Sequence, residues 1–232
     1  MLPAKHGTNF TKAVVKMDYI ILKNVNKTIK DKKILNDINL ELEKGLVHGF
    51  FGRNASGKTM LFRAVAGLIT VDSGVIDVFG KKITDDNSFP DSMGIMIENI
   101  GLWKNLTGLE TLKLIADIKG IIGIDEIKDA LARVGLEPND KRKYKAYSMG
   151  MRQKLVLAQA IMEKPELLIL DEPTNGFDEQ AVELFQKIIL EEKRRGATCL
   201  IATHQKEDIK DLCDKVYNIK DGCCAEVSKE EW

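Results

Sequence analysis

The segment Gly52–Thr59 constrains this chain more than any other part of its sequence. It reads Gly-Arg-Asn-Ala-Ser-Gly-Lys-Thr and matches the pattern G-x-x-x-x-G-K-[ST]. The apolar residues Leu46–Phe51 precede it and are expected to form a strand, and a helix is expected to begin at Gly57 or Lys58 and to end near Gly67. In such a strand–loop–helix unit, backbone N–H groups surround phosphate groups, and the helix N-terminus favours their negative charge. The segment therefore predicts a phosphate site.

Two side chains of this loop are suited to a nucleotide with its metal ion. The Lys58 ammonium can reach the β- and γ-phosphates, and the Thr59 hydroxyl can bind Mg²⁺. The residues that we expect to bind the nucleotide in this loop are Gly52, Arg53, Asn54, Ala55, Ser56, Gly57, Lys58, Thr59 and Met60.

A second segment, Leu167–Leu170, is an apolar strand that is followed by two acids, Asp171 and Glu172. Ligands in open α/β sheets bind outside the carboxyl ends of the strands. Asp171 is therefore suited to a Mg²⁺ contact, and Glu172 to orienting and polarising an attacking water. Acids at a strand end are common in solvated turns. The pair therefore indicates a catalytic site only in combination with the phosphate loop earlier in the chain.

Strands and helices are expected to alternate along most of the chain, which favours a largely parallel sheet with helices on both faces. Tyr19–Val25 and Ile38–Leu42 are expected to form an antiparallel sheet near the N-terminus. Further strands are expected at Val75–Phe79, Met93–Ile97 and Thr198–Ala202, helices at Thr107–Lys119, Asp125–Val134, Ser148–Glu163, Asp178–Arg194 and Gln205–Asp211, and a hairpin around Asp221–Gly222.

No linker or internal repeat divides the chain, so residues 17–232 are expected to form one domain with an inserted helical subdomain at about 101–147. Residues 1–16 are expected to be a loosely ordered extension without the apolar run of a signal peptide. Thirty-five basic residues balance 35 acidic ones, which gives no electrostatic reason to expect a nucleic acid partner. No apolar run approaches the ~18 residues that span a bilayer, so work at a membrane would require another chain.

The order of the motifs resembles that of the ABC ATPase family. Asn54 matches the family's phosphate loop, and Tyr147–Met151 stands where the family has its LSGGQ signature, at the head of an expected helix. Gly176–Asp178 resembles the family's D-loop, and His204 stands where its switch histidine belongs. The resemblance covers Asp18 to Val227 and is specific, because a phosphate loop, a signature, an acid pair and a histidine occur in the family's order.

The resemblance implies a P-loop NTPase fold with a RecA-like α/β core, an N-terminal antiparallel β-subdomain and an α-helical subdomain. It implies ATP and Mg²⁺ as cofactors and two copies that enclose two ATP molecules head to tail. Glu172, His204 and Lys58 would be catalytic, and His204 would sense the γ-phosphate. Ser148 and Gly150 would bind the γ-phosphate held by the opposite copy. A membrane-spanning permease would hold the subunit at the cytoplasmic side of the plasma membrane.

Two departures from the family pattern concern the nucleotide site. Glu98 stands where most members have a glutamine that contacts Mg²⁺ and water, and a carboxylate can bind Mg²⁺ through oxygen as the amide does. With the signature Tyr-Ser-Met-Gly-Met, Glu98 resembles the members that export lantibiotics and bacitracin. Ile29 stands where the family stacks an aromatic residue on adenine, so the base is expected to bind more weakly or less selectively than in the family.

Three functional classes remain compatible with the motifs. The first is the motor of a transporter, by resemblance an exporter of antibiotic peptides or similar amphiphilic substrates. The second is an ABC ATPase that acts without a membrane transporter, for example in iron–sulfur assembly. The third is a nucleotide-binding module without catalysis, against which the complete set of Lys58, Thr59, Asp171, Glu172 and His204 argues.

Overall fold

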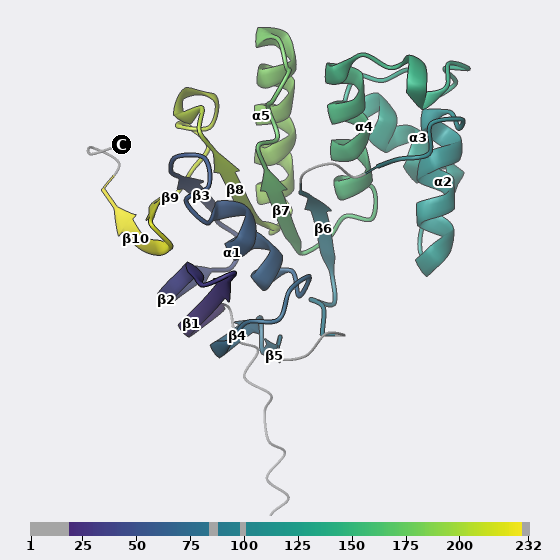
Figure 1. The fold of residues 1–232 in the computed structure, drawn as a ribbon. Helices are drawn as coiled ribbons and strands as arrows, with labels where there is room; N and C mark the ends of the chain where they lie inside the picture. Colours follow the sequence, from purple (N-terminus) through teal and green to yellow (C-terminus); the bar gives the residue numbers. More distant parts are fainter. Residues whose placement is uncertain (1–18, 84–87, 98–100, 229–232) are drawn as a thin grey trace, which may run out of the picture.

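The computed structural model describes residues 19–83, 88–97 and 101–228. An N-terminal hairpin comes first, and strand–helix–strand units occur around α1 and α5, with the three helices α2 to α4 between β6 and β7 (Figure 1). The strands are β1 (Tyr19–Ile29), β2 (Lys32–Glu43), β3 (Val47–Phe51), β4 (Ser73–Val78), β5 (Lys81–Lys82), β6 (Met93–Met96), β7 (Leu167–Asp171), β8 (Thr198–Thr203), β9 (Lys215–Lys220) and β10 (Cys223–Val227). The helices are α1 (Lys58–Val65), α2 (Gly108–Lys119), α3 (Ile124–Arg133), α4 (Met149–Ile161) and α5 (Glu179–Arg194), with 3₁₀ turns η1 (Tyr144–Ala146) and η2 (Lys206–Asp208).

The larger sheet has the strand order β10-β9-β3-β8-β7-β6. All neighbouring strands from β9 to β6 run parallel, and β10 is antiparallel to β9. The expected parallel sheet is therefore confirmed, as is the hairpin at Asp221–Gly222, where both residues have positive φ. Because the strands are parallel, the carboxyl ends of β3, β8 and β7 meet at one edge of the sheet.

Apolar side chains of these strands alternate between two hydrophobic cores. On β7, Leu168 and Leu170 belong to the core that includes α4 and α5, whereas Leu167 and Ile169 belong to the core that includes α1 and the N-terminal strands. All four side chains are fully buried. This burial on both faces explains why the parallel strands are continuous apolar runs in the sequence.

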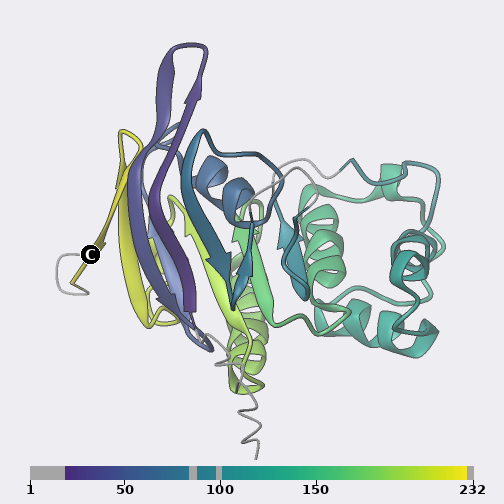
Figure 2. The same cartoon turned by 90° about the horizontal axis from the view of Figure 1, so that it is seen from below.

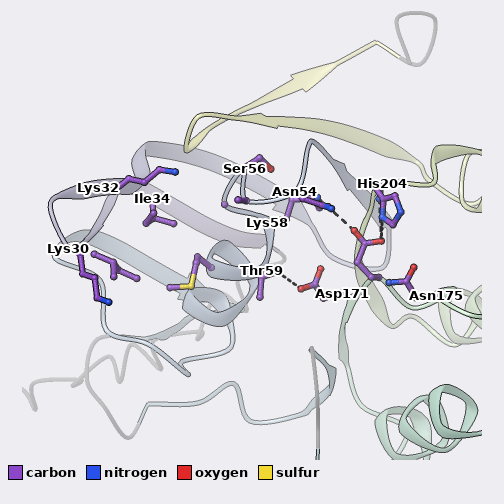
Figure 3. A pocket seen from close by; sticks show the side chains of 15 residues that line it. Lys30, Lys32, Ile34, Asn54, Ser56, Lys58, Thr59, Asp171, Asn175 and His204 are labelled. Carbon is purple, nitrogen blue, oxygen red and sulfur yellow. Dashed lines mark hydrogen bonds and ion pairs between the residues drawn. The ribbon is translucent and has the colours of Figure 1, made fainter. Parts of the chain in front are cut away.

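The smaller sheet has the order β2-β1-β4-β5 and is antiparallel. It confirms the expected N-terminal antiparallel sheet. Figure 2 shows β1 and β2 on one side of α1 and the group of α2, α3 and α4 on the other. The β1–β2 hairpin reaches beyond the rest of its sheet, and its tip lies near the phosphate loop (Figure 3).

The helices α2, α3 and α4 pack against one another, and α4 also packs on β6. The expected capping box begins α2: the Thr107 hydroxyl accepts from the Glu110 N–H, and the Glu110 carboxylate accepts from the Thr107 N–H. Among the described residues, no helix is both long and apolar enough to cross a membrane.

The expected helix Gln205–Asp211 is wrong. The structure has only the 3₁₀ turn η2 there. The backbone bond from the N–H of Leu212 to the Ile209 carbonyl also joins residues three apart, as in a 3₁₀ turn, rather than four apart as in an α-helix. Side chains hold this segment instead: the Thr203 hydroxyl accepts from the Gln205 N–H, and Gln186 donates to the Asp208 carbonyl. These bonds to side chains compete with those of a short helix, whose nucleation is costly.

Candidate functional site

The phosphate loop connects β3 to α1 and is closely packed by backbone on its outer side. A Cβ at Gly52 would lie 2.2 Å from the Ile219 carbonyl oxygen, and one at Gly57 would lie 2.8 Å from the Ile34 carbonyl oxygen. Gly57 also has a left-handed φ of 114°. Both positions therefore require glycine. Ala55 adopts a φ of 62°, which costs roughly 1–2 kcal/mol for a residue with a Cβ.

The Lys58 ammonium lies inside the loop that it belongs to. Its Nζ donates to the carbonyl oxygens of Gly52 at 2.7 Å and of Arg53 at 3.3 Å. The same atom lies 3.8 Å from Oε1 of Glu172. Only 6% of the side chain is exposed. The charge is thus held at the centre of the loop, where phosphate oxygens would replace the carbonyls as partners.

Thr59 and Asp171 meet across the edge of the sheet. The Thr59 hydroxyl, at the start of α1, donates to Oδ2 of Asp171, the last residue of β7, at 2.5 Å. Asp171 is buried. A hydroxyl oxygen and a carboxylate oxygen suit Mg²⁺, which takes few protein ligands and completes its octahedron with phosphate oxygens and water. One hydroxyl and one carboxylate leave the other positions of the octahedron to further ligands, so this donor set fits Mg²⁺ bound together with a nucleotide.

Glu172 leaves the strand in a left-handed conformation, with a φ of 49°. Its N–H donates to the Ala202 carbonyl at 2.8 Å, which keeps it attached to β8. Oε2 of Glu172 lies 2.7 Å from Nδ1 of His204 and accepts, each at 3.3 Å, from the His204 N–H and the Thr203 hydroxyl. Strain of this kind, in a residue other than glycine, is concentrated at functional sites.

These residues surround one cavity of about 690 Å³. Figure 3 shows Lys58, Thr59, Asp171 and His204 on one side of it and the tip of the β1–β2 hairpin on the other. A volume of this size is typical of small-molecule sites. The residues that line it are Ile29, Lys30, Lys32, Ile34, Asn54, Ala55, Ser56, Gly57, Lys58, Thr59, Met60, Asp171, Glu172, Asn175 and His204.

Ser148 and Gly150 do not line this cavity. Ser148 caps α4, and its hydroxyl accepts from the Met151 N–H at 3.2 Å. A Cβ at Gly150 would lie 3.1 Å from the Gly176 carbonyl oxygen, so the signature segment and the D-loop segment contact each other. The remaining candidate, Glu98, lies outside the described residues.

Besides Lys30, Lys32 and Ile34 at the hairpin tip, sequence reasoning missed three residues close to Glu172. Gln153 on α4 donates to the carbonyl oxygens of Glu172 at 3.0 Å and Pro173 at 3.4 Å, and therefore holds the turn that carries Glu172. Asn175 lines the cavity, and Thr203 contacts the Glu172 carboxylate. Asn175 stands four residues after Asp171, and this short spacing could have indicated that it lies at the site. Nothing in the sequence indicates the contact of Gln153 with Glu172, because that contact depends on how α4 packs.

A family model described as ABC transporter matches residues 35–175, which is more than half of the chain. The chain belongs to the ABC transporter family. The matched range contains the phosphate loop, the signature segment and the acid pair, so the family resemblance and the fold class expected from the sequence are confirmed. ABC cassettes bind and hydrolyse ATP, and the chain is accordingly an ATP-binding, ATP-hydrolysing subunit of an ABC transporter.

Curated relatives cover most of this chain. The uncharacterized ABC transporter ATP-binding protein YybJ of Bacillus subtilis is 45% identical over 199 residues, covering 86% of this chain and 91% of the relative. The lantibiotic transport ATP-binding protein SrtF of Streptococcus pyogenes is 33% identical, covering 87% and 86%. The bacitracin transport ATP-binding protein BcrA of Bacillus licheniformis is 35% identical, covering 86% and 66%.

Solved structures share the fold of this ABC subunit. A dimeric bacterial ABC transporter cassette superposes with a TM-score of 0.82 at 22% identity, covering 90% of this chain and 98% of that one. A nucleotide-free ATP-binding cassette superposes with a TM-score of 0.80 at 24% identity, covering 93% of both chains. At these identities, the likeness shows a common fold.

Proposed function

We propose that this subunit binds Mg²⁺·ATP in the cavity described above and uses its hydrolysis to drive export of antibiotic peptides or similar amphiphilic substrates. The observation that carries the nucleotide site is the meeting of three strand ends. The loop after β3 leads to Lys58 and Thr59 at the start of α1, Asp171 ends β7 and is followed by Glu172, and His204 follows β8. The carboxyl ends of adjacent parallel strands are where open α/β sheets bind ligands.

Each side chain has a role that its contacts support. Lys58 binds the β- and γ-phosphates, and Thr59 and Asp171 hold Mg²⁺, which neutralises charge on the phosphate oxygens when bound. Glu172 orients the attacking water and accepts its proton, because its carboxylate is fixed by Thr203 and His204 while Oε1 faces Lys58. His204 holds that carboxylate and senses the γ-phosphate.

We infer that two copies of the subunit complete each site. Ser148 and Gly150 lie outside the cavity of their own chain, and an exposed hydroxyl at a helix N-terminus is suited to binding a phosphate from another chain. The dimeric ABC transporter cassette, which shares the fold of this chain, supports this arrangement. A monomer should bind ATP and hydrolyse it slowly.

A membrane-spanning permease is the second proposed partner, and it would hold the subunit at the cytoplasmic face of the plasma membrane. Leu102 and Trp103 follow Glu98 in the sequence, and each could either pack within the subunit or contact the permease. Leu102 is 5% exposed and belongs to the core, whereas Trp103 is 50% exposed. Trp103 is therefore the residue that we assign to the permease contact.

The peptide-export hypothesis is supported by the relatives that carry lantibiotic or bacitracin transport in their names. The experiment that tests it is affinity purification of the tagged subunit from membranes in mild detergent, with identification of the bound chains, followed by a growth assay on bacitracin and lantibiotics. We expect a polytopic membrane protein to co-purify and deletion to raise peptide sensitivity. Recovery of soluble partners alone would favour the alternative, an ABC ATPase that acts without a transporter.

Glu98 is proposed to link the nucleotide state to the permease. Because its carboxylate can bind Mg²⁺ through oxygen, Glu98→Ala should reduce export in the growth assay more than it reduces ATP affinity. Equal loss of both would contradict coupling through Glu98. Glu98→Gln, which restores the residue usual in the family, is the matched variant and should keep both.

A further inference from the structure

The turn that carries Glu172 is bound on both sides by neighbouring elements. The Glu172 N–H donates to the Ala202 carbonyl on β8 at 2.8 Å. The Glu172 carbonyl accepts from Nε2 of Gln153 on α4 at 3.0 Å and from the Asn175 N–H at 3.3 Å. The Gln153 amide also donates to the Pro173 carbonyl at 3.4 Å. One side chain of α4 therefore binds two consecutive carbonyls of the turn.

The backbone of Glu172 adopts a conformation that depends on such bonds. Its φ of 49° lies in the left-handed region, which is uncommon for a residue other than glycine. A residue stays in this region only where its surroundings fix it. Without the amide of Gln153, the turn would be free to relax, and the carboxylate would shift from its place between Nδ1 of His204 and Nζ of Lys58. The direction of the carboxylate therefore depends on a side chain that binds the backbone of Glu172.

Gln153 lies on the helix whose N-terminus is proposed to meet the nucleotide of the opposite copy. Ser148 caps α4, and Gln153 follows five residues later, about 7.5 Å along the helix axis. The two segments also touch at Gly150, where an added Cβ would lie 3.1 Å from the Gly176 carbonyl oxygen. The first turns of α4 and the turn after β7 therefore contact each other at two places. A change in the position of α4 would be transmitted to Glu172 through these contacts.

We propose that Gln153 is a positioning residue for hydrolysis and makes the alignment of the Glu172 carboxylate depend on α4. In a pair of copies, binding of Ser148 to the opposite nucleotide would fix α4, and the Gln153 amide would then fix the turn that carries the base of this copy's own site. ATP in one copy thereby aligns the base that acts on ATP in the other. This inference rests on the proposed function, since it requires Glu172 to act on the attacking water and Ser148 to meet the opposite copy's nucleotide.

Replacing Gln153 by Met tests the amide, because methionine is similarly long and flexible but has no N–H donor. In the full chain at saturating Mg²⁺·ATP, at protein concentrations that give pairs, single-turnover hydrolysis should slow by ~10- to 100-fold, because a misplacement of about 1 Å can cost up to that much. The Kd for ATP should stay unchanged, since the phosphate loop keeps its contacts. Gln159→Met is the matched control, on the same helix and without a hydrogen bond to the Glu172 turn in the described part of the chain. It should hydrolyse ATP as the parent does.

Two further measurements separate positioning from a loss of structure. Gln153→Lys keeps N–H donors on a side chain long enough to reach the turn, so it should recover most of the rate. In a chain that carries Glu172→Gln, adding Gln153→Met should slow hydrolysis no further, because residues that act as a unit are not additive. A structural defect would instead lower the rate in both backgrounds.

The link through α4 predicts that the effect depends on pairing. Where sedimentation velocity shows the ATP-bound chain as a monomer, no opposite nucleotide fixes α4, and the loss of rate caused by Gln153→Met should be clearly smaller than in pairs. An equal loss at both concentrations would overturn the dependence on α4.

Equal rates for Gln153→Met and Gln159→Met beside an active parent would overturn the inference and leave the nucleotide site intact, as would failure of Gln153→Lys to recover the rate. If Gln153→Met does not fold, Gln153→Glu takes its place, because glutamate has the same shape and no donor when ionised. A parent chain that neither binds nor hydrolyses ATP would contradict the proposed function itself, and the inference with it.

Discussion

Oε2 of Glu172 lies 2.7 Å from Nδ1 of His204, although the two residues follow different strands. The contact exists because β7 and β8 are parallel neighbours, with Asp171 paired to Ala202. Oε1, the other carboxylate oxygen, lies 3.8 Å from the Lys58 ammonium. One oxygen is thus held by the end of β8, while the other faces the phosphate loop, where a water near the γ-phosphate would be bound.

Replacing Glu172 by Gln should leave ATP affinity intact and slow hydrolysis by ~10²–10⁴-fold, since an amide keeps the shape but cannot accept the proton of the water. Single-turnover hydrolysis and an equilibrium titration with ATP measure the two effects. Unchanged hydrolysis would remove Glu172 from the role of base. His204→Gln is the companion variant and should slow hydrolysis without changing ATP affinity.

Replacing Thr59 by Val should raise the Mg²⁺ concentration needed for half-maximal hydrolysis by about tenfold or more, because the variant loses one oxygen ligand while its volume is nearly kept. Thr59→Ser retains the hydroxyl and should behave as the parent does. A magnesium titration of hydrolysis at saturating ATP checks this. The assignment of Thr59 would be wrong if the valine and serine variants gave the same midpoint.

The buried His48 should make stability depend on pH below its ordinary pKa. Its Nε2 lies 2.9 Å from the Glu43 carbonyl oxygen, so Nε2 carries the hydrogen, and the Tyr217 hydroxyl lies 3.5 Å from Nδ1. Burial, the largest influence, lowers the pKa of His48 from 6.5, and the bond to Glu43 partly opposes it.

The sign of the effect follows from proton uptake. Because the unfolded chain binds a proton at His48 more readily than the folded chain, the free energy of unfolding should fall as pH falls below 6.5, towards the folded pKa. Denaturant titrations at about pH 7.5 and about pH 5.5 measure the change. His48→Gln should flatten the slope in this window, and an equal slope in both proteins would contradict the prediction. The carboxyl groups of Asp72 and Glu110 have lowered pKa values, so their effect on the free energy of unfolding falls at lower pH than this window.

Glu192 should contribute strongly to stability. Its side chain is 1% exposed and binds Arg133 on α3 at 2.8 Å and Arg195 at 2.5 Å, which ties the helical group to α5. Removing one partner of a buried ion pair costs ~3–5 kcal/mol, and partial exposure of the arginines reduces this to about 2–3 kcal/mol for Glu192→Ala.

Glu191 also binds Arg133, but its side chain is 39% exposed. Glu191→Ala is therefore the control and should cost at most ~1 kcal/mol in denaturant titrations. Equal costs for the two variants would contradict this assignment.

Features that depend on neighbours in the chain were predictable from the sequence. The phosphate loop, the capping box of α2 and the alternation of strands and helices all follow from local patterns. The proximity of Thr59 to Asp171 also followed, because parallel strands place their carboxyl ends at one edge.

Features that depend on packing were not predictable. The position of Gln153 against the carbonyl of Glu172 requires knowing that α4 begins beside the end of β7. The segment after His204 was predicted as a helix because its own residues allow one, but bonds from Thr203 and Gln186 redirect its backbone. The left-handed backbone of Glu172 likewise comes from its attachment to β8, not from its residue type.

The order of the strands has a consequence for synthesis of the protein. Both neighbours of β3 in the sheet, β8 and β9, are made long after it, because helices α1 to α5 come between them in the chain. A chain still growing on the ribosome therefore has a phosphate loop whose strand is unpaired on both edges, and it lacks the Ile219 carbonyl that packs against Gly52. Nucleotide can stabilise the subunit only after β8 and β9 have been made, so until then the nascent chain must avoid aggregation without help from its ligand.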